Sequence, residues 1–108
     1  MGATKTTGFT DQQNQLADYA KAFAHPARIA ILQFLIQRNA CVCGDIVDEL
    51  PLSQSTVSQH LKELKRIGVV QGIIEGPRVC YCIDPAVWQR MKTMLGELLT
   101  SFKSKSCC

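Results

Sequence analysis

The sequence of 108 residues lacks several features that define common protein classes. No apolar run approaches the roughly 20 residues that a helix needs to span a bilayer. The N-terminal segment MGATKTTGFT is polar and contains no apolar stretch typical of a secretory signal. Histidine occurs only twice, and no grouping of acid, base and nucleophile is visible apart from the thiols. We therefore expect a cytoplasmic protein that is neither a membrane protein nor an enzyme.

Charged residues are also sparse, at 19%, but their balance is basic, with a formal net charge of +3. A mildly basic domain can bind nucleic acid, although the distribution of the charges matters more than their sum. The length corresponds to one domain, which is small enough that a partner chain would help to bury its apolar surface.

Cysteine, in contrast, is abundant. Six cysteines fall into three close pairs: Cys41 with Cys43, Cys80 with Cys82, and Cys107 with Cys108. In a chain without a secretory signal, such thiols argue against a disulfide framework and favour metal, redox or catalytic chemistry.

Apolar periodicity predicts a helical domain over residues 11–102, between a flexible arm of residues 1–10 and a flexible cysteine-containing tail of residues 103–108. Helices are expected over residues 11–24, 25–39 and 45–50, from Ser53 to Gly68, and over residues 85–102. Between the last two helices, residues 69–75 and 78–84 are rich in β-branched residues and are typical of a hairpin.

The apolar stripes of these helices predict which side chains face the core or, in the last helix, also a partner chain. They comprise Leu16, Tyr19, Ala20 and Phe23; Ile29, Leu32, Leu35 and Ile36; Val57, Leu61 and Leu64; and Val87, Met91, Met94, Leu95, Leu98 and Phe102. The last stripe is longer than one short domain can cover, which favours a dimer.

The order of these elements is that of a winged helix-turn-helix, a mainly α fold with a β-hairpin wing (α+β). The helix after Ser53 would then be the recognition helix, whose N-terminal side chains face the bases of DNA. The residues expected to meet bases or the nearby backbone are Gln54, Ser55, Thr56, Ser58, Gln59 and His60. Those expected to meet phosphates or a narrow minor groove are Lys62, Lys65, Arg66 and Arg78. A solvated polar helix face would have the same composition, and His60 could instead be structural.

Four segments, HPARIAIL, CVCGDI, LSQSTVSQHLKELKRIGVV and EGPRVCYCID, resemble the ArsR/SmtB family of bacterial metal-responsive repressors. The resemblance covers about residues 16–84. It implies a homodimer, formed mainly by the first and last helices, that binds a double-stranded operator without metal and leaves it on metal binding.

Within that family, the pair Cys41 and Cys43 before the recognition helix resembles the arsenic/antimony and cadmium/lead sensing branches. A helix N-terminus favours the thiolate that ligates soft metals. Residues i and i+2 of a helix point about 200° apart, so one ion can be shared only if this junction bends or unwinds. We predict Cys41 and Cys43 as ligands of an inducer, which is As(III) or Sb(III), with Cd(II), Pb(II) or Zn(II) as alternatives.

The identity of a third ligand stays open. The third cysteine that is common in the arsenic branch is absent, because Gly44 and Asp45 follow the pair, and residues 1–24 contain no cysteine either. The remaining candidates are Cys80, Cys82, Cys107, Cys108 or a small thiol. Strand alternation sets Cys80 and Cys82 on one face, opposite the larger apolar set that includes Tyr81, which leaves the thiols outward.

Two other functions compete with this one. A repressor of the same fold could sense redox state or persulfide through a disulfide, although a Cys-x-Cys pair forms a strained one. A four-thiol zinc module would favour Cys-x₂-Cys spacing, which this chain does not have.

Overall fold

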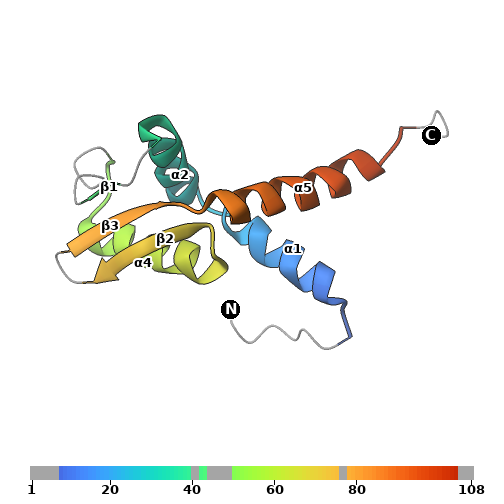
Figure 1. Cartoon of the computed structure of the whole chain (residues 1–108), viewed down its shortest axis with the longest axis horizontal. Coiled ribbons are helices and arrows are strands. Elements are labelled where there is room, and N and C mark those ends of the chain that lie inside the picture. Colours follow the sequence, from blue (N-terminus) through green and yellow to red (C-terminus); the bar gives the residue numbers. More distant parts are fainter. Residues whose placement is uncertain (1–7, 40–41, 44–49, 76–77, 105–108) are drawn as a thin grey trace.

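The computed structural model describes residues 8–39, 42–43, 50–75 and 78–104. Its helices and strands are α1 (Asp11–Lys21), α2 (Pro26–Arg38), β1 (Val42–Cys43), α4 (Gln54–Ile67), β2 (Val70–Glu75), β3 (Arg78–Ile83) and α5 (Pro85–Ser101). Figure 1 shows the sheet and α4 at one end of the molecule, while α5 extends away from them with α1 beside it. The helix expected over residues 45–50 lies outside the described residues, apart from its last residue. No described helix is long and apolar enough to cross a membrane.

Local capping explains where the helices begin. Ser53 accepts a hydrogen bond from the Thr56 N–H at 3.3 Å, and Asp84 Oδ1 accepts one from the Ala86 N–H at 3.0 Å. These side chains satisfy backbone donors that the first turn leaves without a helical partner. Gly68 ends α4 with a positive φ of 100°. All three caps confirm the expected boundaries.

The first helix is shorter than expected, because α1 ends at Lys21 and not at residue 24. The backbone there changes to tighter i to i−3 hydrogen bonds, with the Ala24 N–H donating to the Lys21 carbonyl at 3.2 Å. Pro26, at the first position of α2, disfavours helical geometry at the residue before it, so the two helices cannot be continuous.

The sheet has three strands in the order β1-β3-β2, whereas the sequence predicted only the hairpin. The hairpin itself is confirmed, with β2 and β3 antiparallel from Val70 opposite Ile83 to Glu75 opposite Arg78. The additional strand β1 pairs with the other edge of β3, and it lies where a break was expected. Two residues are too few to give a periodic signal, so this strand cannot be predicted from the sequence.

The hairpin requires a glycine at position 72. Gly72 has a φ of +135° and lies opposite Tyr81. A Cβ at this position would overlap the carbonyl oxygen of Cys80 and lie 2.7 Å from the Cα of Tyr81. Strands β2 and β3 therefore approach each other more closely here than a side chain would allow.

The core lies between α2, α4 and the sheet. As predicted, Val57, Leu61 and Leu64 of α4 are buried, with at most 2% of their surface exposed. The predictions for Ala20 and Ile36 are wrong, because Ala20 is exposed and 51% of Ile36 is exposed. Helix α2 is apolar on several sides, so its periodicity alone does not identify the side chains that remain outside the core.

Candidate DNA-binding surface and thiol site

Helix α4 presents a polar face opposite its three buried leucine and valine side chains. Ser55, Gln59, Lys62 and Arg66, at successive spacings of four, three and four residues, share this face and are all exposed. Of the other predicted DNA contacts, Gln54 and Lys65 are exposed, while Thr56 and Ser58 are half-buried. Arg78 is the first residue of β3 and pairs with Glu75 at the end of the hairpin. These positions allow the contacts expected of a recognition helix and a wing.

Some of the predicted base-contacting hydroxyls also take part in the helix cap. Ser53 Oγ lies 2.9 Å from the hydroxyl oxygen of Thr56 and 3.2 Å from that of Ser55. The cap therefore holds both side chains in defined positions at the N-terminus of α4. Thr56 in particular is oriented toward the cap, whereas Ser55 lies on the exposed face.

The cation of Arg66 is paired within the protein. Its guanidinium donates to both carboxylate oxygens of Glu63, at 3.0 and 2.7 Å, and lies 3.7 Å from Asp18 of α1. The hydrogen bond from Arg66 lowers the pKa of Glu63, and the same bond raises the pKa of Arg66 above its ordinary value. Binding of Arg66 to a phosphate would compete with these contacts.

His60 turns toward α2 and away from the exposed stripe. Its Nδ1 accepts a hydrogen bond from Arg28 Nε at 3.2 Å, and its ring centroid lies 4.6 Å from that of His25. Burial lowers the pKa of His60, and the nearby His25 and Arg28 lower it further. The neutral imidazole thus joins α4 to the start of α2, where His25 accepts a hydrogen bond from the Ala27 N–H at 2.9 Å. Contact between His60 and DNA stays a prediction.

The sheet brings together two cysteines that are far apart in the sequence. Cys43 of β1 lies directly opposite Cys80 of β3, and Cys80 is disulfide-bonded. Cys43 therefore lies in a strand, which corrects the expectation that the Cys-x-Cys pair begins a helix. Cys41, Cys107 and Cys108 lie outside the described residues.

The predicted alternation along β3 is confirmed by the burial of Tyr81, only 1% of which is exposed. Cys80 and Cys82 share the opposite face of the strand, where both are half-buried and not fully outward. Cys82 is a free thiol, and the amide nitrogen of Gln71 on β2 lies 3.9 Å from its sulfur. In the part of the chain that the structure describes, no three side chains of His, Cys, Asp or Glu are grouped as a metal site would require.

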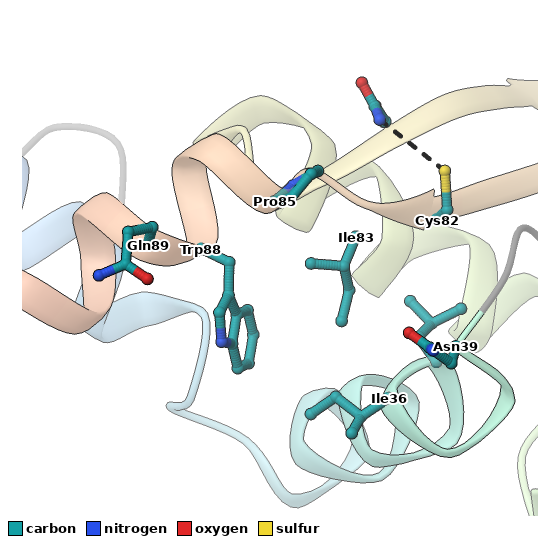
Figure 2. A pocket seen from close by; sticks show the side chains of 9 residues that line it. Ile36, Asn39, Cys82, Ile83, Pro85, Trp88 and Gln89 are labelled. Carbon is teal, nitrogen blue, oxygen red and sulfur yellow. Dashed lines mark hydrogen bonds between the residues drawn. The ribbon is translucent and has the colours of Figure 1, made fainter.

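A hollow of about 610 Å³ lies next to Cys82, between α2, the sheet and α5. Its lining residues are Leu35, Ile36, Asn39, Gln71, Cys82, Ile83, Pro85, Trp88 and Gln89. Figure 2 shows that the sulfur of Cys82 points toward the Gln71 amide and away from Trp88 and Ile36. Apolar side chains make up most of the lining of the hollow, and the thiol of Cys82 lies at its margin.

The buried helix α2, the capped helix α4 and the hairpin define a winged helix-turn-helix, the architecture of many DNA-binding proteins. Residues 25–71 match the model of a protein family described as "Bacterial regulatory protein, arsR family". The uncharacterized HTH-type transcriptional regulator MJ1325 of Methanocaldococcus jannaschii is 37% identical over 84 residues, which cover 76% of this chain and 93% of that protein. The HTH-type transcriptional repressor SmtB of Mycobacterium tuberculosis is 48% identical over 61 residues, which cover 56% of this chain and 44% of SmtB.

A solved structure of similar fold is the homodimeric winged helix-turn-helix DNA-binding domain of Mb0332 from Mycobacterium bovis, a possible ArsR-family transcriptional regulator. It has a TM-score of 0.60 and 26% identity, and the match covers 93% of this chain and 99% of that domain. The chain belongs to the ArsR family of bacterial transcriptional regulators. Its fold class is thereby confirmed, as is the expectation of a regulator and not an enzyme.

Proposed function

We propose that this protein is a homodimeric repressor that binds operator DNA and releases it when arsenite or antimonite binds to the thiolates of Cys41 and Cys43. The observation that carries the proposal is the pairing of Cys43 with Cys80 across β1 and β3. It supports Cys80 as a further ligand, because two cysteines that can supply soft thiolates once they are reduced occupy opposed positions in the sheet. Trivalent arsenic and antimony take a small set of soft thiolates, whereas tetrahedral zinc would need further ligands.

The position of β3 supports a coupling between inducer and DNA. This strand pairs with β1 on one edge and with β2, the other strand of the wing, on the other edge. A ligand that joins Cys43 to Cys80 would therefore act on the wing directly. By linkage, inducer and operator must weaken each other's binding by the same factor. A change from a 99:1 to a 1:99 ratio of bound to free repressor requires a coupling of about 5.5 kcal/mol.

The DNA-contacting surface would be formed by the exposed face of α4 and by the wing. Ser55 and Gln59 carry hydrogen-bonding groups that can meet base edges, whereas Lys62 can neutralise a phosphate. We expect Ser55→Ala to weaken operator binding more than binding to random DNA. Lys62→Ala should weaken both by similar factors. Equal losses on the two DNAs for both variants would contradict the assignment of Ser55 to the bases.

The dimer would use α1 and α5. Leu98, Leu99 and Phe102, at the C-terminal end of α5, have 53%, 73% and 79% of their surface exposed, which is unfavourable for such large apolar side chains. Analytical ultracentrifugation at micromolar concentration should give a dimer for the wild type and a larger monomer fraction for Leu99→Asp. Lys92→Asp, at an exposed polar position of the same helix, is the matched control and should remain dimeric. A monomeric wild type would contradict this interface.

The inducer is tested by titrating operator-bound repressor with arsenite, antimonite, cadmium, lead and zinc, and following release by fluorescence anisotropy. We expect arsenite and antimonite to release the wild type, and Cys41→Ser and Cys43→Ser to bind operator but not to respond. Release by cadmium or lead alone would assign the protein to those metals. If Cys107→Ser abolishes release while Cys41→Ser and Cys43→Ser respond normally, the inducer site lies elsewhere.

A further inference from the structure

We propose that Cys43 and Cys80 form a reversible disulfide between β1 and β3, so that thiol oxidation is a second input to this regulator. Two observations lead to this pair. Cys80 is disulfide-bonded, and the residue directly opposite it on the neighbouring strand is Cys43. On the other edge of β3, Cys80 is opposite Ile73, so Cys43 is its only cysteine partner in the described register.

The spacing of an antiparallel pair suits this bond. Directly opposed residues have Cα atoms about 4.5 to 5.5 Å apart. This range lies within the separation of about 4.4 to 6.8 Å that a disulfide requires. The pair can therefore be oxidised without moving either strand, in contrast to a disulfide within the sequence Cys-x-Cys.

The neighbouring thiol provides an internal comparison. Cys82 is two residues further along β3, shares a face of the strand with Cys80, and is half-buried like it. It is nevertheless a free thiol, and it lies opposite Gln71 of β2. The difference between the two cysteines is thus one of register, because only Cys80 lies opposite another cysteine in the described strands.

The oxidation can proceed by exchange with a small-molecule disulfide. One protein thiolate attacks a sulfur of that disulfide, forms a mixed disulfide and displaces one small thiolate. The second protein thiolate then attacks the protein-bound sulfur, which forms the Cys43–Cys80 bond and displaces the second small thiolate. The protein loses two electrons and two protons, and the small disulfide is reduced to two thiols. An excess of the small thiol reverses both steps.

A consequence for the inducer rests on the proposed function. The disulfide occupies two of the sulfurs that would otherwise be available to arsenite. The oxidised protein should therefore require at least about tenfold more arsenite for release from the operator, a change that corresponds to about 1.4 kcal/mol. The metalloid response would operate only while the pair is reduced.

The test treats the reduced full-length protein with glutathione disulfide, alkylates the remaining thiols in denaturant and counts them by mass spectrometry. We expect the wild type to lose two alkylatable thiols, to yield a peptide that links Cys43 to Cys80, and to recover both thiols with dithiothreitol. Cys82→Ser is the matched control and should form the same link. Cys80→Ser should not yield any peptide that links Cys43 to β3 at comparable glutathione disulfide concentrations.

A disulfide that maps to other cysteines in the wild type would overturn the proposal, as would loss of the link in Cys82→Ser. Mapping in the wild type does not depend on the folding of any variant. Arsenite titration of the oxidised, operator-bound wild type separates the two proposals. If the link maps to Cys43 and Cys80 but arsenite still releases the oxidised protein normally, the disulfide is established and the ligand role of these two thiolates is refuted.

Discussion

Replacement of Lys62 by alanine should change the salt dependence of DNA binding in a predictable way. Lys62 is exposed on the face of α4 that also carries Ser55 and Gln59, the side chains expected to reach the bases. Each phosphate that a protein neutralises contributes about −0.9 to the slope of log K against log salt concentration. In a homodimer the substitution removes two such contacts, so the slope should become less steep by about 1.8.

The contrast with Arg66 makes this prediction specific. Arg66 already pairs with Glu63 and Asp18, so it must give up these contacts before it neutralises a phosphate. We expect Arg66→Ala to change the slope by less than half as much as Lys62→Ala. The assay is fluorescence anisotropy on random duplex DNA between about 50 and 200 mM salt. An unchanged slope for Lys62→Ala, or a larger change for Arg66→Ala, would refute the reasoning.

Three further predictions concern the stability of the fold. Ser53→Ala removes the cap of α4 and should lower the free energy of unfolding by about 1 kcal/mol, measured by urea denaturation; no loss would mean that the cap is dispensable. Gly72→Ala should disrupt the pairing with Tyr81 and melt at a lower temperature by calorimetry, whereas an unchanged melting temperature would contradict the close approach of β2 and β3. Burial lowers the pKa of His60, so the unfolded chain binds the proton more strongly and stability should fall as pH decreases below about 6.5. His60→Gln should reduce this dependence in denaturation curves recorded at several pH values, and an identical pH profile would exclude His60 as its source.

The parts of the fold that depend on local chemistry could be predicted from the sequence. Ser53, Gly68 and Asp84 act within one turn of their own helix ends, so their residue types are sufficient to place those ends. The end of α1 was misplaced because it depends on how the chain turns before Pro26. The exposure of Ile36 depends on which sides of an apolar helix the other elements cover, and this information is not contained in the helix itself.

The arrangement of the cysteines was also only partly predictable, because part of it depends on residues that are distant in the sequence. The alternation along β3 correctly separated Cys80 and Cys82 from Tyr81, because the period of a strand is local. The strand pairing of Cys80 with Cys43 was not predictable, since Cys43 lies in a two-residue strand that precedes α4 in the sequence. Cys80 was among the candidate additional ligands. Without the strand register, however, the sequence did not favour Cys80 over Cys82 as the residue opposite Cys43.

A disulfide between β1 and β3 would also constrain the unfolded chain. A bond between Cys43 and Cys80 closes a loop of about 38 residues that contains the whole of α4 and the first strand of the wing. In the chain-entropy description, a closed loop of this length removes enough disorder from the unfolded ensemble to stabilise the fold by about 4 kcal/mol. Oxidation would thus close α4 and β2 into a covalent loop. After thermal unfolding, this loop would refold with β1 and β3 already held close together.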